Sequence, residues 1–287
     1  HSTETAVLRV LSDILEAVDR GDVAALILLD LSAAFDTVDH DILLQRLQLS
    51  FGIDGSAHRW FRSYLTDRSQ FVRRGLLKSA VSRLLFGVPQ GSVLGPILFV
   101  LYTADLLSLV EDGGLLPHLY ADDTQVYGSC RPSAVAAFSA KVTECVDAVA
   151  SWMKSNRLQL NSGKTEVLWC TTNRRQHQLP TAALKIDGVP VPPVASVRDL
   201  GIYIDADLVM RTHVQRTVSR CFAALRQLRQ LRRCVSADTL RTLVVGLSLV
   251  LSRLDYGNSV LPSRTTGLPR LSAIVSAEYV GSAGLQP

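Results

Sequence analysis

The sequence predicts an α+β domain followed by a region built from helices alone. Segments with strand-like and helix-like patterns are intermixed as far as about residue 205, and only helix-like segments follow. The chain has 287 residues, of which 47% are hydrophobic and 20% are charged. This composition is typical of a globular protein that buries a sizeable core, and it disfavours a disordered chain.

The first two elements are predicted to be a helix and a buried strand. Apolar side chains recur at helical spacing over residues 2–20, where Ser2 or Thr3 can cap the helix. Residues 24–29 form an unbroken apolar run that ends directly at Asp30. Such a run suits a strand that is buried on both faces.

The remaining elements follow from helical spacing, from alternation and from turn residues. Helices are expected over residues 39–47, 58–69, from Pro96 onward, 134–156, 212–231 and 236–253. Strands are expected as a hairpin over residues 118–128, one strand within 158–170 and a strand pair over 195–208. The tail after about residue 262 is rich in Gly, Pro and Ser and is expected to be poorly ordered.

Cysteine use and hydropathy predict an intracellular protein, in the nucleus or the cytoplasm, that is not secreted. The five cysteines are odd in number and form no CxxC pair, which disfavours a disulfide framework or a zinc site. The longest apolar runs are too short to span a bilayer, so no membrane partner is expected. The chain opens on His1 without a signal peptide, which suggests a processed or excerpted product.

Three aspartates are the strongest candidates for a catalytic site. Asp122 and Asp123 lie at the turn of the expected hairpin, "HLYADDTQVYG", and Asp30 ends the buried strand. If the two elements are neighbours in one sheet, the three carboxylates converge and need cations, and hard carboxylate oxygens select Mg²⁺ or Mn²⁺. Two such ions would suit phosphoryl transfer. Asp is also common at strand ends and in turns, so spacing alone leaves both interpretations open.

A second signal is a run of arginines in the expected helices near the end of the chain. Arginine outnumbers lysine 25 to 5, which suits phosphate contacts, although GC-rich coding sequence would raise arginine content equally well. Residues 208–237 contain seven arginines and no acidic residue. Apolar residues form one predicted helical face, at Val214, Val218, Phe222, Leu225 and Leu228. The single sign of charge favours contact with a phosphate backbone over an ordinary solvated face.

Five blocks carry a family resemblance, and they occur in the family's order. They are "LLDLSAAFDTVDHDIL", "GVPQGSVLGPILFVLYTADL", "YADD", "LQLNSGKTEVL" and "VRDLGIYID". Over roughly residues 1–262 the chain resembles the reverse transcriptase of non-LTR (LINE-type) retrotransposons. The resemblance implies a right-hand polymerase fold, with a palm of a small antiparallel sheet backed by helices and then an all-helical thumb. The implied domains are a leading helix at 1–23, the palm at 24–205, a basic thumb at 206–262 and the tail at 263–287.

The resemblance also implies roles for individual residues. Metal binding and catalysis fall to Asp30, Asp122 and Asp123, and the incoming nucleotide to Leu31, Ser32, Phe35, Gln90, Gly91 and Lys164. The primer grip falls to Leu200 and Gly201, and nucleic-acid contacts fall to Arg211, Arg216, Arg220, Arg226 and Arg229. Phe35 would act as a steric gate, but ordinary core packing also explains it, and a loop lysine such as Lys164 is often only a solvated charge. Asp36 is left out of the catalytic set.

The implied function is RNA-directed DNA polymerase, a nucleotidyltransferase that uses two Mg²⁺ or Mn²⁺ ions. Its partners would be an RNA template, a DNA primer and dNTPs, and the oligomeric state is not indicated. The fingers and endonuclease blocks that the family carries would precede this chain. The alternative is an inactive or repurposed retroelement remnant that only binds nucleic acid, and an unrelated two-metal nuclease is a third interpretation.

Overall fold

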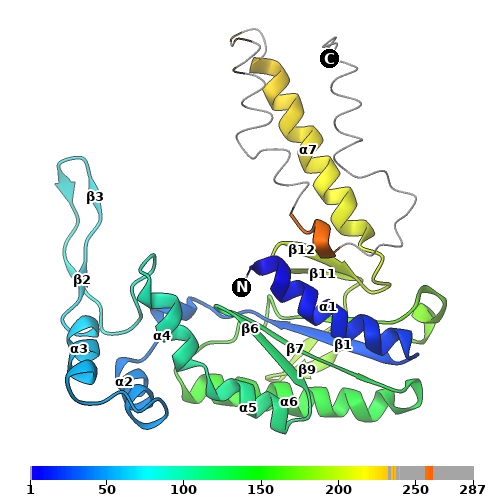
Figure 1. Cartoon of the computed structure of the whole chain (residues 1–287), viewed down its shortest axis with the longest axis horizontal. Coiled ribbons are helices and arrows are strands. Elements are labelled where there is room, and N and C mark those ends of the chain that lie inside the picture. Colours follow the sequence, from blue (N-terminus) through cyan, green and yellow to red (C-terminus); the bar gives the residue numbers. More distant parts are fainter. Residues whose placement is uncertain (1, 232–233, 235, 237–238, 240–255, 261–287) are drawn as a thin grey trace. The chain divides into compact units, whose positions relative to one another are not determined.

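The computed structural model describes residues 2–231, 234, 236, 239 and 256–260 (Figure 1). Helices are α1 Thr3–Asp19, α2 His40–Leu49, α3 Gly55–Leu65, α4 Leu94–Tyr102, α5 Asp105–Asp112, α6 Val135–Ser155 and α7 Arg211–Leu231, with 3₁₀ turns η1 Ala34–Asp36, η2 Pro132–Ala134, η3 Asn173–Gln178 and η4 Asn258–Val260. Strands are β1 Val23–Leu29, β2 Ser69–Gln70, β3 Arg73–Arg74, β4 Leu77–Lys78, β5 Ser82–Arg83, β6 Leu116–Tyr120, β7 Asp123–Cys130, β8 Glu166–Cys170, β9 Leu184–Ile186, β10 Val189–Val191, β11 Ser196–Asp199 and β12 Ile202–Asp205. The predicted α+β content is confirmed. The expected helix at 236–253 and the tail at 263–287 lie outside the described residues.

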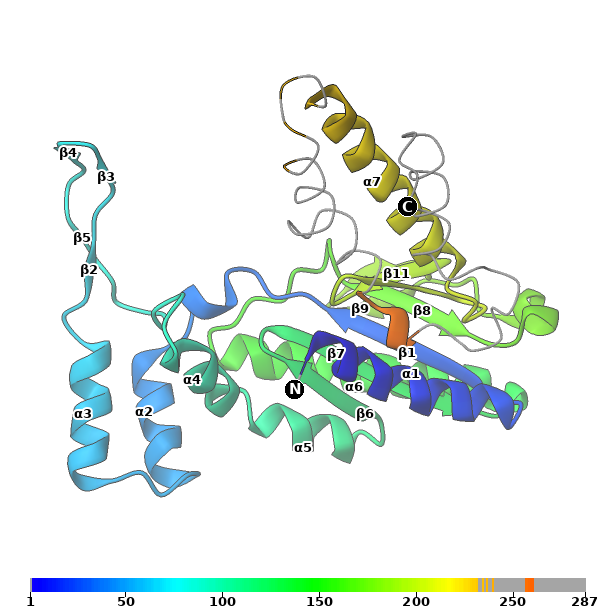
Figure 2. The same cartoon turned by 45° about the horizontal axis from the view of Figure 1, so that its top comes forward.

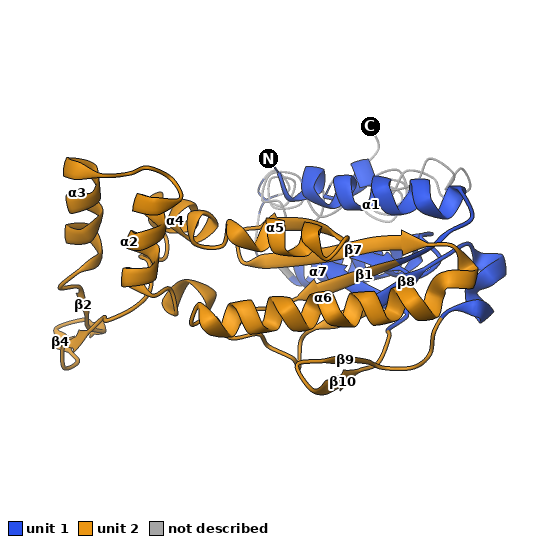
Figure 3. Ribbon diagram, turned by 90° about the horizontal axis from the view of Figure 1, so that it is seen from below, with its two compact units in different colours: residues 1–24, 168–179, 194–287 blue, residues 25–167, 180–193 orange. Residues whose placement is uncertain are grey.

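The chain forms two compact units, each assembled from separate stretches (Figure 3). Unit 1 comprises His1–Ala24, Leu168–Leu179 and Val194–Pro287, and unit 2 comprises Ala25–Val167 and Pro180–Pro193. These two compact units have different boundaries from the leading helix, palm and thumb that the resemblance implies. Those functional domains stay predictions.

The main sheet has four strands in the order β6-β7-β1-β8. Strands β6 and β7 pair antiparallel, with Tyr120 opposite Asp123 at the turn, so the predicted hairpin is confirmed. The apolar run in β1 is buried along almost its whole length, as its composition predicts. Helix α6 buries side chains at helical spacing, and within unit 2 it packs against α5 and β9. The sheet therefore has a packed core beneath the carboxylates.

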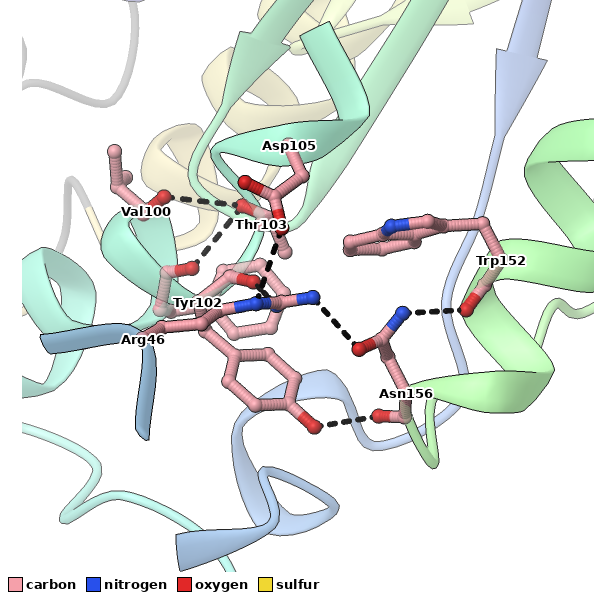
Figure 4. A network of polar contacts seen from close by, with 8 residues as sticks. Arg46, Val100, Tyr102, Thr103, Asp105, Trp152 and Asn156 are labelled. Atoms are coloured by element: carbon pink, nitrogen blue, oxygen red, sulfur yellow. Dashed lines mark hydrogen bonds and ion pairs between the residues drawn. The ribbon is translucent and has the colours of Figure 1, made fainter. Parts of the chain in front are cut away.

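A largely buried arginine joins the helices of unit 2 through a polar network (Figure 4). The side chain of Arg46 in α2 is only 12% exposed, and its Nε lies 3.3 Å from Asp105 Oδ2. Its guanidinium also donates to the carbonyl of Tyr102 and, at 2.7 Å, to Asn156 Oδ1, and it lies over the rings of Tyr102 and Trp152. Because a buried cation is tolerated only when it is fully partnered, this network fixes α2, α4, α5 and the end of α6 in one arrangement.

One segment in the described part of the chain, Leu94–Asp112, is apolar and long enough to cross a membrane by length and composition alone. In the structure this segment is two helices, α4 and α5, which separate at Thr103 and Ala104. Helix α4 packs against α2, and α5 packs against α6. Core helices of globular proteins pass the same test of composition; in this segment 39% of the apolar window is buried, including Phe99, whereas Ile97 and Val100 are exposed.

Unit 1 contains α1, the β11–β12 hairpin and α7. Ser2 caps α1 through a reciprocal capping box with Thr5, which confirms the predicted helix start. Strand β12 contacts α7, and α1 contacts η4.

The buried face of α7 differs from the predicted one. The buried side chains are His213, Cys221, Ala224, Leu225 and Leu228, whereas Val214, Val218 and Phe222 are half-buried. His213 accounts for part of the shift, because its Nδ1 accepts the Tyr203 N–H at 3.4 Å beside β12. Burial lowers the pKa of His213, which favours the neutral ring that can accept this bond. A sequence pattern that counts histidine as polar leaves His213 out of the apolar face of α7 and starts that face at Val214 instead.

Candidate active site

The structure brings Asp30, Asp122 and Asp123 to one edge of the main sheet. Asp30 directly follows β1, Asp122 lies in the turn after β6, and Asp123 is the first residue of β7. Strand β7 is hydrogen-bonded to β1 in the sheet, so the two elements are neighbours, as convergence of the three carboxylates requires. All three aspartates belong to unit 2, so this convergence is internal to one compact body.

The turn that presents Asp122 is tight and strained. Only Ala121 and Asp122 separate the paired residues Tyr120 and Asp123, so this is a two-residue hairpin connection. Ala121 has a φ of +55°, in the left-handed region that usually takes glycine or asparagine. Such a conformation costs about 1 kcal/mol or more, and it is found at functional sites where the surrounding structure enforces it.

The three carboxylates interact electrostatically. Asp123 has an exposed face, yet partial withdrawal from water raises the pKa of its carboxyl above the ordinary value. The negative charges of Asp122 and then Asp30 raise the pKa further. The charge repulsion that the doubled aspartate predicts is therefore present. Nearby positive charge would therefore stabilise the ionised cluster.

Lys164 supplies part of that positive charge. Its Nζ lies 3.5 Å from Asp30 Oδ2, which is buried and has no hydrogen-bond partner within the described chain. The Lys164 side chain itself is 70% exposed, so a metal ion can replace its ammonium group beside Asp30 with little loss of packing. The loop that carries Lys164 is held to the strand end, because the Asn161 N–H donates to the carbonyl of Asp30 at 2.8 Å.

The hydrogen bonds of the loop that carries Lys164 involve a backbone amide to which the resemblance gives another role. The resemblance implies that the amides of Leu31 and Ser32 face the triphosphate, but the Ser32 N–H already donates to Gln159 at 2.9 Å. Leu31 lies between Asp30 and Ser32, the two residues that make these backbone hydrogen bonds to the loop, and it forms an antiparallel bridge with Leu160. The Ser32 amide is therefore committed to the loop that positions Lys164, and only a rearrangement would free it.

Phe35 is half-buried, in the short turn η1. Its ring lies 4.9 Å from that of Phe99 in α4, at an interplanar angle of 42°. One side of the ring is thus supported by the core, while the residue as a whole remains partly exposed. This geometry is compatible with both interpretations of Phe35, the packing residue and the steric gate.

The turn-rich segment near Gln90 is hydrogen-bonded to the segment around Phe35. The N–H groups of Gly87 and Val88 donate to the carbonyls of Val38 and Phe35, both at 2.8 Å. Gln90 and Gly91 are exposed, and Gln90 Nε2 lies 3.4 Å from Asp36 Oδ1. The Asp36 carboxylate therefore faces this turn, and its exclusion from the catalytic set stays a prediction. The neighbouring Asp39 caps α2 by accepting the N–H groups of Asp41 and Ile42, as aspartate commonly does at a helix start.

Leu200 and Gly201 form the two-residue turn between β11 and β12 in unit 1. Both have positive φ, +43° and +91°, as the favoured hairpin turns require, although leucine is a strained choice there. The Tyr256 hydroxyl donates to the Leu200 carbonyl and lies 2.9 Å from Thr3 Oγ1. A Cβ at position 201 would lie 3.2 Å from the Tyr256 ring. The turn is therefore clamped from one side.

The five candidate arginines of α7 are all exposed, and two of them contact a tyrosine that sequence reasoning missed. The Tyr203 ring has Arg216 at 4.8 Å and Arg198 and Arg220 each at 5.9 Å. Arg198 and Tyr203 are paired across β11 and β12, a register that the sequence did not specify. Three guanidinium groups around one ring, with no acidic partner among the described residues, favour an anion.

The described residues include no group of three or more His, Cys, Asp or Glu side chains that could hold a metal ion on its own. Magnesium, however, is usually bound by one or two carboxylates together with water and substrate phosphates. The residues present fit that mode, because Asp30 offers a buried carboxylate oxygen without a hydrogen bond next to two further aspartates. The chemistry of the site therefore suits a hard divalent cation.

The chain is similar in sequence to known proteins over the region that contains the three aspartates. A family model described as "Reverse transcriptase (RNA-dependent DNA polymerase)" matches residues 4–204. The chain is 32% identical over 246 residues to a probable RNA-directed DNA polymerase from transposon BS of Drosophila melanogaster, covering 84% of this chain and 26% of that protein. It is 28% identical over 219 residues to the RNA-directed DNA polymerase from mobile element jockey of the same species, covering 75% of this chain and 23% of that protein. The chain thus spans about a quarter of the length of these relatives.

A solved structure is also similar. Apo telomerase from Candida tropicalis, truncated from its C-terminal domain, aligns with a TM-score of 0.49 and 15% identity, covering 72% of this chain and 39% of that one.

Proposed function

This chain belongs to the reverse transcriptase (RNA-dependent DNA polymerase) family, and on that basis we propose that it is the polymerase region of a LINE-type retrotransposon protein. It would extend a DNA primer along an RNA template, adding dNTPs to the primer 3′-hydroxyl. In this proposal the main sheet with its helices is the palm, and α7 belongs to the thumb. The relatives are named as polymerases from mobile elements, which supports this assignment.

One observation carries the proposal. Three carboxylates from two neighbouring strands interact at one sheet edge, where a buried Asp30 oxygen has Lys164 as its only counter-charge among the described residues. Family members use divalent metal ions, and here Asp30, Asp122 and Asp123 are the residues that would hold two Mg²⁺ or Mn²⁺ ions. Bound there, the ions would supply neutralisation of charge on the reacting phosphate and activation of the primer hydroxyl.

The other residues of unit 2 would position the nucleotide. Lys164 would exchange its ion pair with Asp30 for the triphosphate, because its exposed side chain can swing without disturbing the core. Gln90 and Gly91 would lie against the templating pair, and the open space around Gly91 suits a close approach. Phe35, supported from behind by Phe99, would meet the sugar.

Unit 1 would hold the duplex. The clamped turn at Leu200 and Gly201 would contact the primer end. The exposed arginines of α7, with the Tyr203 cluster, would contact backbone phosphates without reading sequence. These contacts would weaken steeply as salt rises, because each phosphate contact releases counterions.

The proposal is tested by primer extension with purified residues 1–287. We expect dNTP incorporation on an RNA template that requires Mg²⁺ or Mn²⁺ and stops when the metal is chelated. Salt-sensitive binding of primer–template without any extension at either metal would instead favour the alternative, a remnant that only holds nucleic acid.

A Phe35→Ala variant separates the two interpretations of this ring. We expect its preference for dNTPs over ribonucleotides to fall by about tenfold or more, because the space for a 2′-hydroxyl opens. Single-nucleotide incorporation with matched dNTP and rNTP measures the ratio. Phe35→Leu is the control, since it keeps apolar burial against Phe99 while it removes the flat ring. An unchanged ratio together with lower stability would assign Phe35 to core packing.

A further inference from the structure

A protruding arm in unit 2 has no place in the proposed chemistry. We define the arm as α3 together with the hairpin of β2, β3, β4 and β5, residues 55–83. Figures 1 and 2 both show this hairpin standing out beyond the end of α3. Its ladders pair only two residues each, Ser69–Gln70 with Ser82–Arg83 and Arg73–Arg74 with Leu77–Lys78. A lone two-stranded hairpin is marginally stable in water, so a feature of this kind is usually completed by a partner.

The hairpin exposes apolar side chains to an unusual degree. Leu76, at its tip, is 96% exposed, and the other exposed apolar residues of the hairpin are Phe71, Val72, Leu77 and Val81. The tip turns at Gly75, whose φ is +61°. Apolar exposure on this scale within one short hairpin favours an interaction surface.

Helix α3 carries an aromatic platform. Trp60 and Tyr64 are stacked, with ring centroids 5.4 Å apart and an interplanar angle of 11°, and Phe61 meets the Trp60 ring edge-on at 5.2 Å. Of the residues in α3, only Leu65 is fully buried, and Trp60 remains 51% exposed. Two parallel rings already in place offer a flat surface on which a further planar group can stack without loss of side-chain freedom.

The arm and the segment after it concentrate the positive charge of the chain. Residues 55–104 contain seven Arg and Lys side chains and one Asp, a net charge of +6, whereas the whole chain carries +4. On the hairpin, Arg73, Arg74, Lys78 and Arg83 are exposed, and none has an acidic partner within the described residues. The Lys78 Nζ lies 4.9 Å from the centre of the Phe71 ring. A single sign of charge without internal partners calls for an anionic occupant.

We propose that the arm binds single-stranded nucleic acid, at a surface separate from the carboxylate site. Unpaired bases would stack on the Trp60–Tyr64 platform, and phosphates would contact Arg73, Arg74 and Lys78. Proteins that bind single strands without regard to sequence combine aromatic rings, on which bases stack, with basic side chains that follow the backbone, and the arm carries both kinds of group. A globular protein partner would meet the apolar residues but would need a matching acidic surface as well, whereas a nucleic acid supplies planar bases and phosphates together. This surface goes beyond the proposed polymerase function and does not depend on it.

Tryptophan fluorescence of residues 1–287 provides the test, with unprimed oligouridine as the probe. Trp169 is fully buried and Trp152 is half-buried beneath Arg46, so quenching by stacked bases reports chiefly on Trp60. We expect oligouridine to quench the wild type and the Asp122→Asn variant equally. Trp60→Leu should abolish the quenching and weaken binding by roughly 5- to 150-fold, the range for losing one stacked base.

The salt dependence provides a second, independent measurement. Arg73→Gln with Arg74→Gln should flatten the slope of log K against log salt by about 1.4, which is about 0.7 for each lost phosphate contact on a single strand. The matched control is Arg131→Gln with Lys185→Gln, which removes two exposed charges of unit 2 away from the arm and should leave the slope unchanged. Equal thermal unfolding of all variants would show that folding is intact.

Several outcomes would overturn the proposal. One is a salt slope that changes equally in the arm variant and in the control. Another is a blue shift of Trp60 emission with phosphatidylserine–phosphatidylcholine vesicles but no response to oligouridine, which would make the arm a membrane surface. Concentration-dependent self-association lost in Trp60→Leu, without RNA quenching, would make it a contact between copies. Failure of primer extension with quenching intact would count against the proposed function alone.

Discussion

Replacing Asp122 by asparagine is expected to reduce primer extension by about 10³-fold or more, to background, while binding of primer–template stays within about twofold of the wild type. Asparagine keeps the size of the side chain but removes one negative charge from the turn between β6 and β7. Charge at this sheet edge is what would attract and hold a divalent ion. Duplex binding is expected to persist, because it is assigned to arginines of α7 in unit 1.

Single-turnover extension on an RNA template measures the first effect, and salt-titrated fluorescence anisotropy measures the second. Asp112→Asn is the matched control, because it removes an exposed charge at the end of α5 without touching the carboxylate cluster. The substitution also removes one of the causes that raise the pKa of Asp123, so that pKa should move down toward its ordinary value. Extension by Asp122→Asn at the wild-type rate would remove the catalytic role from this cluster.

Gly87→Ala is expected to have the largest effect on stability that also reaches the site. A Cβ on Gly87 would lie 2.9 Å from Asp36 Cα and 3.0 Å from the carbonyl oxygens of Phe35 and Asp36, all of them backbone atoms. The residue also has a φ of +85°, which alanine tolerates poorly. We expect the free energy of unfolding to fall by about 2–4 kcal/mol, with extension reduced as Phe35 is displaced.

The urea midpoint at unchanged slope measures the stability change, and the dNTP-to-rNTP ratio reports on Phe35. Gly52→Ala is the control, because Gly52 has a φ of +65° but nothing within 4 Å of its Cβ, so it isolates backbone strain at about 1 kcal/mol. Equal effects of the two substitutions would mean that the Gly87 contact with the Phe35 segment contributes nothing.

The parts of the fold that the sequence predicts well are those decided by local chemistry. The apolar run of β1 has no other way to be satisfied than burial, and Ser2 and Asp39 cap their helices as their positions predict. The hairpin at Asp122 follows from alternation around a short polar turn. These features needed no knowledge of distant residues, and they already place each of the three aspartates at the end of a strand or in a turn.

The parts that escaped prediction depend on contacts between segments far apart in the sequence. The strand register that sets Arg198 beside Tyr203 and the Phe99 ring behind Phe35 come from tertiary packing. The two-residue strands of the arm are too short to leave a pattern of alternation. The Ser32 amide was given a ligand, but the fold uses it to hold the Lys164 loop.

The clamp on the Leu200 turn has a consequence for how the chain folds during synthesis. Tyr256 links Leu200 to Thr3, and the neighbouring Gly257 N–H donates to Glu4 Oε1. Unit 1 therefore cannot be completed until residue 257 has left the ribosome, whereas all residues of unit 2 have emerged once residue 193 has. At a translation rate of about 5–20 residues per second, the roughly 240 residues between α1 and Gly257 take about 12–50 s to synthesise, so the first helix waits that long for its last contact. During that interval the apolar face of α1 is a natural client for chaperones.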